Sequence, residues 1–266
     1  MLRLPSLPLA GLALAALAAA TPVRAEEAGA GTLYPAEAFP TGDLVRRPLT
    51  LAAGLLQLDL PLAVAPNGGP TAGTWFLPAS LDYGITPDLQ AGLYQQVGPC
   101  LSGEAGGCAS GYDDLGLRTR YGLFRAPASQ LVAQASVLAS HFDRLQWEGS
   151  LGLAYKHTLG RVALVGQLDL GIALDRRSER LYGELLVGTL ECQVRVAERL
   201  GASLAAGTAG ALGVRSPYSI PPAFPLEAGL EWSPLHAVGL GAQVAIPDLA
   251  RSAALWQLRL LVRIYL

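Results

Sequence analysis

The C-terminal stretch from Ala253 to Leu266 alternates between two kinds of position with almost no exception. Every even-numbered residue from Trp256 to Leu266 is apolar, whereas the odd-numbered positions include Arg259 and Arg263. Successive side chains in a strand point to opposite sides, so this stretch predicts a strand with one apolar face and one charged face.

The same alternation recurs upstream. In the first such segment, Leu56, Leu58, Leu60 and Leu62 share one face, and Asp59 lies on the other. The predicted strands cover residues 49–64, 72–84, 88–96, 113–124, 130–140, 146–156, 161–174, 181–197, 200–212, 225–232, 237–246 and 253–266.

The connections between these strands alternate in length. Residues 85–87, 125–129, 157–160, 198–199 and 233–236 make short turns, and the intervening connections include the much longer 97–112 and 213–224. Outer-membrane barrels have short periplasmic turns and longer extracellular loops, and a lipid-exposed sheet cannot leave an open edge. The sequence therefore predicts an all-β fold: a closed antiparallel transmembrane β-barrel of about 12 strands in an up-and-down meander, over residues 48–266, with both ends on the periplasmic side.

Aromatic residues lie near the ends of the predicted strands. They fall into a periplasmic set and an outer set, the two girdles expected at membrane interfaces: Tyr83, Tyr121, Tyr155, Trp232 and Tyr265 in the first, and Trp147, Tyr182 and Trp256 in the second. The composition agrees, since 51% of the chain is hydrophobic and only 15% is charged. Beyond the first residues, no apolar run is long enough for a transmembrane helix.

The beginning of the chain predicts secretion. Residues 1–25 resemble a signal peptide: Arg3 precedes an apolar run, and Val23-Arg24-Ala25 offers a cleavage site. Residues 26–47 are rich in Ala, Gly and Pro without periodicity and predict a flexible periplasmic lead-in. Cleavage would remove two of the 19 basic residues and none of the 21 acidic ones, which leaves a net charge of −4. That balance gives no reason to expect nucleic-acid binding. The predicted location is the outer membrane, and the predicted partners are its lipid, the barrel-assembly machinery during insertion and a small solute.

The three cysteines separate into two groups. Cys100 and Cys108 lie in one glycine-rich polar stretch, where an oxidising compartment favours a disulfide that closes a short loop. Cys192 occupies an apolar position of its strand and is expected to face lipid as a small hydrophobic residue.

Charged residues gather on the inward face of the predicted strands. The candidate lumen charges are Asp59, Asp82, Arg118, Arg120, Glu148, Lys156, Asp169, Glu191, Arg195, Glu227, Glu231, Arg259 and Arg263. One interpretation is a charged constriction that sets solute preference. The other is a salt-bridged lumen that stiffens and fills the barrel. Since the last strand closes against the first, its arginines are expected near Asp59.

Catalysis finds little support in the sequence. Outer-membrane phospholipases need a nucleophile and a base on one surface. His157 and His236 fall in predicted turns. His141 lies near the outer rim beside Ser140 and Asp143, but adjacent positions on a strand point to opposite faces, so Ser140 and His141 cannot pair on one surface without a turn. Nucleotide, zinc and calcium signatures are missing, so the sequence predicts no enzyme, metal or cofactor site.

Three motifs carry a family resemblance: Arg47-Pro48-Leu49-Thr50-Leu51, the segment from Ser80 to Leu89, and the segment from Asp113 to Tyr121. With the overall pattern over residues 47–266, they resemble the outer-membrane β-barrel superfamily of gram-negative bacteria, especially the group related to meta-pathway phenol-degradation proteins. One departure is the end Tyr265-Leu266, where such barrels usually end in Phe. The resemblance implies a passive channel for small or apolar solutes. A closed structural or adhesive barrel and, more remotely, a lipid-modifying enzyme are the alternatives.

Overall fold

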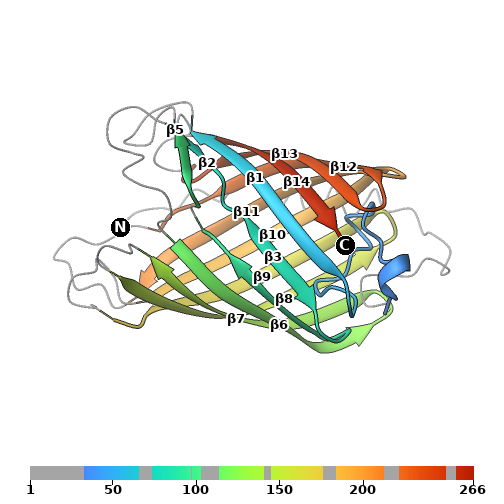
Figure 1. Ribbon diagram of the computed structural model, residues 1–266, viewed down its shortest axis with the longest axis horizontal. Helices are drawn as coiled ribbons and strands as arrows, with labels where there is room; N and C mark the ends of the chain where they lie inside the picture. The colour runs from blue at the N-terminus through green and yellow to red at the C-terminus, as the bar shows by residue number, and fades with distance from the viewer. Residues whose placement is uncertain are drawn as a thin grey trace, which may run out of the picture.

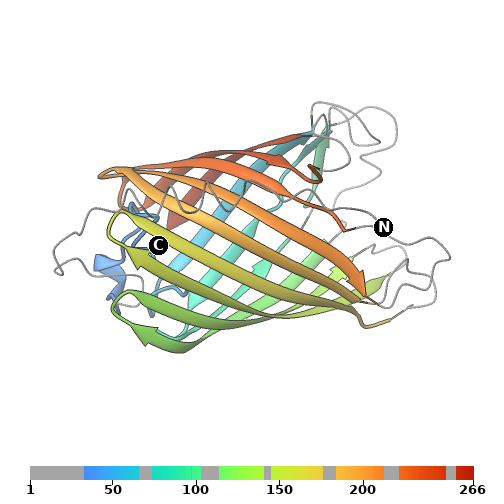
Figure 2. The ribbon, with the colours of Figure 1, turned by 180° about the vertical axis from the view of Figure 1, so that it is seen from behind.

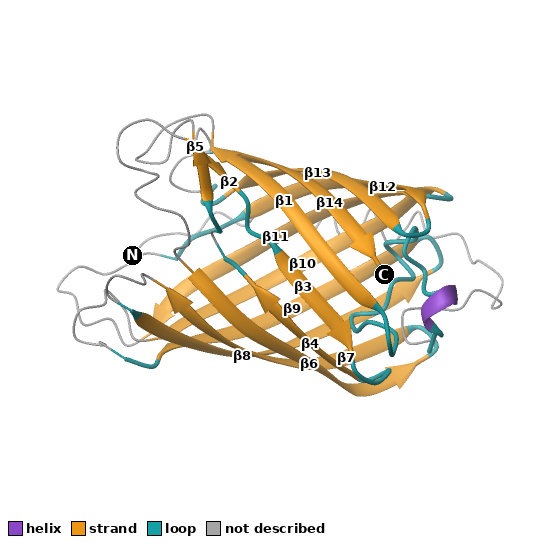
Figure 3. Ribbon diagram, in the orientation of Figure 1, coloured by secondary structure: helices purple, strands orange, loops and turns teal. Residues whose placement is uncertain are grey.

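The computed structural model describes residues 33–65, 74–96, 98–102, 114–140, 145–175, 184–212, 222–249 and 256–266. In this part of the chain almost every element is a strand, and one short 3-10 helix, η1 (Ala36–Ala38), precedes them (Figure 3). The strands are β1 (Leu56–Ala65), β2 (Thr74–Phe76), β3 (Ser80–Gly84), β4 (Leu89–Tyr94), β5 (Cys100–Ser102), β6 (Asp114–Ala126), β7 (Ser129–Ser140), β8 (Gln146–Leu159), β9 (Val162–Ala173), β10 (Glu184–Ala197), β11 (Leu200–Leu212), β12 (Leu226–Leu235), β13 (Val238–Ile246) and β14 (Gln257–Tyr265).

Consecutive strands pair antiparallel around the molecule, and β14 pairs with β1 to close the sheet (Figure 1). β2 and β3 pair with the two halves of β1 and together occupy one strand position, interrupted around Pro78. β5 pairs with β2, and β4 pairs with β3 and β6, so these two segments share the next position. The result confirms the predicted closed antiparallel barrel of 12 strands. The far wall, from β8 to β12, is continuous in Figure 2.

The alternation predicted from the sequence is visible on single strands. On β6, Leu117 and Tyr121 are 63% and 54% exposed on the outer surface, while Arg118 and Arg120 between them line the interior. Among the described residues, no helix is long and apolar enough to cross a membrane.

The two ends of the barrel differ. The connections from β6 to β7, β8 to β9, β10 to β11 and β12 to β13 are tight turns at one end, which we call the short-turn end. The C-terminal end of β14 and residues 33–55 lie at this same end (Figure 1).

Residues 33–55, which we call the inserted segment, differ most from expectation. The first strand was predicted from residue 49, but β1 begins at Leu56, and residues 26–47 were predicted as a flexible lead-in. In the structure Phe39 and Val45 are 1% and 0% exposed, and Thr41 and Thr50 are also buried. The physical reason is that this segment bonds wall residues far away in the sequence, Gln130 and Lys156 among them, which no local period encodes.

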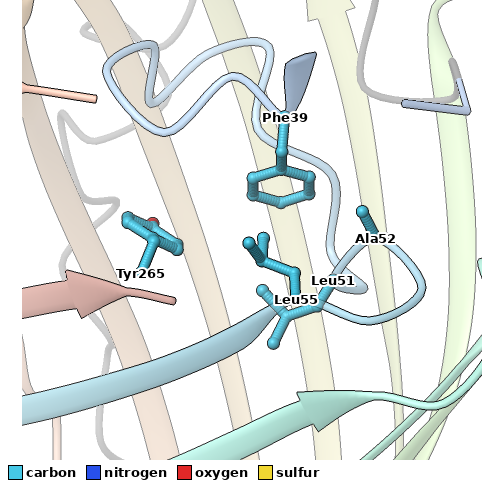
Figure 4. Packing of buried hydrophobic residues seen from close by; sticks show 5 residues of the cluster. All are labelled: Phe39, Leu51, Ala52, Leu55 and Tyr265. Carbon is cyan, nitrogen blue, oxygen red and sulfur yellow. The ribbon is translucent and has the colours of Figure 1, made fainter. Parts of the chain in front are cut away.

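A small apolar cluster fixes the segment to the wall. Phe39, Leu51, Ala52 and Leu55 pack with Tyr265 at the end of β14, and the rings of Phe39 and Tyr265 lie 6.1 Å apart (Figure 4). Tyr265 was predicted for the periplasmic girdle, but it points inward and is only 4% exposed. Its odd-numbered position places it on the inward face, and the inserted segment covers it there.

Other boundaries need smaller corrections. Residues 97–112 were predicted as one loop, but residues 100–102 form β5. His157 was predicted in a turn and instead lies in β8, where its Nδ1 is 2.7 Å from the Ser129 hydroxyl. The outer aromatic Tyr182 lies outside the described residues, whereas Tyr83, Tyr121, Tyr155, Trp147 and Trp232 are exposed as expected.

Candidate functional site

The barrel interior contains a cavity of about 820 Å³. Its walls come from strands all around the barrel, including β1, β3, β4, β6, β8, β10, β12, β13 and β14. Its floor, at the short-turn end, comes from Leu44, Arg47, Pro48 and Leu49 of the inserted segment. This volume is comparable to that of pockets that enclose small-molecule ligands, roughly 300–1,000 Å³.

Of the thirteen charged residues predicted for the lumen, nine line this cavity: Asp59, Asp82, Arg118, Arg120, Lys156, Glu191, Glu231, Arg259 and Arg263. The other four are Glu148, Asp169, Arg195 and Glu227. Asp169 accepts a hydrogen bond from Gln167, which lines the cavity, and Glu227 accepts one from Gln243, which also lines it. Arg195 instead pairs with Asp43 of the inserted segment, 2.7 Å away.

The closure of the barrel brings together one group of charges. Asp59 on β1 lies directly opposite Arg263 on β14, and the Arg263 Nε donates to Asp59 at 2.7 Å. Arg263 also donates to Glu231 at 3.0 Å, and Glu231 accepts a further bond from Arg47 of the inserted segment. Burial lowers the pKa of the Arg47 guanidinium, but Tyr265 and Glu231 outweigh that effect, so its pKa is raised and it stays charged.

A second ion pair joins two strands that are separated by a third. Arg118 on β6 and Asp82 on β3 are separated by β4, and Gly92 is the β4 residue between them in the register. The Arg118 guanidinium reaches over Gly92 to bind both Asp82 oxygens. A Cβ at Gly92 would lie 2.3 Å from the Asp82 Oδ1, so only glycine leaves room for this pair.

A similar arrangement, with a glycine between two polar partners, occurs at a second place on the wall. Gln134 on β7 donates to Asp169 on β9, and Gly152 on β8 lies between them in the register. A Cβ at Gly152 would lie 1.9 Å from the Asp169 Oδ1. At both places the polar side chains lie along the wall rather than across the lumen. The paired charges therefore satisfy one another and still leave the cavity open.

Lys156 connects the wall with the floor of the cavity. Its Nζ donates to the Gln193 side chain at 2.8 Å and to the backbone carbonyls of Leu44 and Arg47 at 2.8 and 2.9 Å. The side chain is almost completely buried. Lys156 was predicted as a lumen charge, and it lines the cavity while it holds the inserted segment.

Arg120 differs from the other cavity arginines. No carboxylate of the described residues lies within salt-bridge distance of it. Its guanidinium donates a hydrogen bond to the Leu49 carbonyl at 3.4 Å. Its guanidinium therefore lines the cavity without an ion-pair partner among the described residues.

Some cavity residues were missed by the charge pattern. Gln57, Gln90, Gln193, Gln243 and Gln257 line the cavity, as do Arg47 and Tyr94. The glutamines occupy inward positions of their strands, so uncharged polar residues at those positions were the signal that could have found them. Arg47 carried no such signal because its segment is not periodic.

The residues of the cysteine and histidine expectations lie partly outside the described structure. Cys100 is disulfide-bonded and Cys192 is a free thiol, but Cys108 lies outside the described residues, so its pairing with Cys100 stays a prediction. His141 and Asp143 also lie outside them. Within the described ranges, no group of three or more His, Cys, Asp or Glu residues could hold a metal ion.

Comparison with solved structures places the fold. The COG4313 outer membrane channel from Pseudomonas putida F1 is similar over 82% of this chain and 97% of its own, at 15% identity and a TM-score of 0.52. A NanC porin is similar over 78% of this chain and 98% of its own, at 8% identity and a TM-score of 0.55. The fold is that of outer-membrane β-barrels. No family model and no curated protein sequence matches the chain.

Proposed function

We propose that this protein is an outer-membrane channel for small polar solutes. The observation that carries the proposal is the cavity of about 820 Å³, which persists although most of the charges around it are paired. A barrel stiffened by a filled, salt-bridged lumen would leave no such space. The similar solved structures, an outer-membrane channel and a porin, support the same conclusion.

The lining favours polar solutes. Arginines, carboxylates and glutamines surround the cavity, and these groups replace the hydrogen bonds that a hydrated solute gives up. Apolar side chains, Phe76, Val165 and Leu261 among them, line the cavity too, so the apolar solutes implied by the resemblance to the meta-pathway phenol-degradation group would meet a surface of mixed polarity. Arg120 and Glu191 both line the cavity without an ion-pair partner among the described residues, so the lining offers one cation and one anion to charged solutes.

The location follows from the same proposal. Residues 1–25 would act as a signal peptide, and the assembly machinery would insert the barrel with the short-turn end toward the periplasm. The exposed leucines of the outer surface, such as Leu117 and Leu151, would then face lipid.

Liposome swelling tests the solute class. Liposomes that contain the purified protein should swell in isotonic solutions of small sugars and small carboxylates, and more slowly as solute size increases. Protein-free liposomes are the control. A closed structural barrel, the alternative function, predicts no swelling with any solute.

A further inference from the structure

The inserted segment reaches opposite sides of the lumen at the short-turn end. The Leu51 and Leu49 N–H groups donate to Gln90 of β4 and Gln130 of β7. The Leu44 carbonyl accepts from Lys156 of β8. Its own side chains Asp43 and Arg47 pair with β10 and β12. Since strands follow one another around a barrel, contacts with all of these strands require the segment to cross the mouth (Figure 1).

The segment is also a tightly buried part of the described molecule. Of the nine large side chains that are fully buried there, Phe39, Thr41, Val45 and Thr50 belong to it. It forms the floor of the cavity. A solute that moves through the lumen toward the short-turn end therefore meets this segment.

Two parts of the segment are held in different ways. Residues 48–55 continue directly into β1, and Leu51 and Leu55 pack in the apolar cluster of Figure 4. Residues 33–47 reach the wall through side chains, by apolar packing of Tyr34, Ala36 and Phe39 and by the ion pairs of Asp43 and Arg47. Their backbone–backbone hydrogen bonds among the described residues stay within the segment, whereas Gly54 and Leu55 bond Gly84 of β3. Thr41 Oγ1 and Arg47 Nε are buried without a hydrogen-bond partner in the described structure.

These contacts make residues 33–47 separable from the wall. Water can solvate the ions and carbonyls at this interface, including the two orphaned atoms, if the segment moves away. Residues 48–55 stay with the wall, because their backbone bonds β3 and continues into β1.

We propose that residues 33–47 form a gate, which closes the short-turn mouth of the lumen in this structure and leaves it when a solute passes. This inference rests on the proposed channel function. Lys156, Arg195 and Glu231 act as the latch, because they hold the gate from three different strands.

A reversible cross-link between gate and wall tests the proposal. A Cβ built at Gly42 would lie 3.4 Å from the Cβ of Ser233 on β12, close to the roughly 3.5–4.5 Å that a disulfide requires. The double variant Gly42→Cys/Ser233→Cys, made in a Cys192→Ala background, should form a bridge that fixes the gate. Its single-channel current in planar bilayers is compared before and after reduction.

The proposal predicts that the oxidised protein shows no channel openings and that they return on reduction. The single variant Gly42→Cys in the same background controls for reduction of the native disulfide at Cys100 and should behave the same in both conditions. Asp43→Asn, which removes the partner of Arg195, should increase the fraction of time open. Migration of the folded barrel on unheated gels verifies that each variant is folded.

Two results would overturn the proposal in distinguishable ways. Equal currents from the oxidised and reduced cross-linked protein would reject the gate and leave the channel function intact. Absence of current from every folded variant, including Asp43→Asn, would reject the channel function and the gate with it.

Discussion

At the scale of single residues, glycine determines where charges can lie. Gly92 and Gly152 occupy inward positions between two polar partners, and their missing side chains let those partners meet across a strand. The lumen thus carries many charges while it remains open. The identity of the pairs was not predictable from the sequence, because it depends on the register of three strands.

Gly92→Ala should therefore disrupt the ion pair of Arg118 with Asp82. The new methyl group meets the Asp82 carboxylate and the Leu81 carbonyl, and such overpacking costs about 1–3 kcal/mol. Urea-induced unfolding in detergent or lipid measures the loss. Gly166→Ala is the matched control, since no atom lies within 4 Å of its Cβ position. Equal stability of both variants would contradict this account.

Cysteine chemistry gives a second prediction at this scale. Cys100 is disulfide-bonded, and Cys108 is the partner predicted from the sequence. Thiol counting in denatured, unreduced protein from the cell envelope should find one free thiol, that of Cys192, and three after reduction. Three free thiols before reduction would refute the bridge.

At the scale of elements, the sequence predicted strands well and the inserted segment poorly. Alternation is a local signal, so β11 was predicted at residues 200–212, the bounds that it has in the structure. The inserted segment instead depends on distant partners: Leu49 bonds Gln130, and Leu44 bonds Lys156. No local period encodes such contacts. The inward-facing Lys156, whose register neighbours Gln130 and Val165 are not acidic, was a sign that the lumen holds something polar there.

Lys156→Met should loosen the inserted segment. The Leu44 and Arg47 carbonyls lose their donor, and an unsatisfied buried group costs about 1–3 kcal/mol. Limited trypsin digestion should then cut after Arg46 faster than in the wild type. His236→Gln, in an exposed turn, is the control. Unchanged digestion would show that Lys156 does not hold the segment.

At the scale of the whole molecule, the two faces of the barrel wall differ in polarity. Arg259 lines the cavity and Leu260 beside it is exposed on the outer surface. Because the closed barrel separates lumen from lipid, neighbouring positions on one strand should respond differently to a change in charge. The sequence predicted this division from alternation alone, whereas the space inside the lumen required the structure.

Arg259→Glu should shift the reversal potential in a salt gradient toward cations, since a constriction focuses the field of its charges on the permeating ion. Leu260→Arg should instead impair insertion, at a cost of roughly 2–4 kcal/mol near the bilayer midplane. The two readouts are reversal potential in planar bilayers and the yield of folded protein in membranes. Identical effects of the two substitutions would argue against an open lumen.

The central claim is that the lumen conducts, and single-channel recording of the refolded protein tests it most directly. The account predicts discrete current steps from the wild type and more frequent or longer ones from Asp43→Asn, in which the inserted segment is less firmly held. Folded protein that never conducts, as wild type or as this variant, would contradict the account and leave a closed structural barrel.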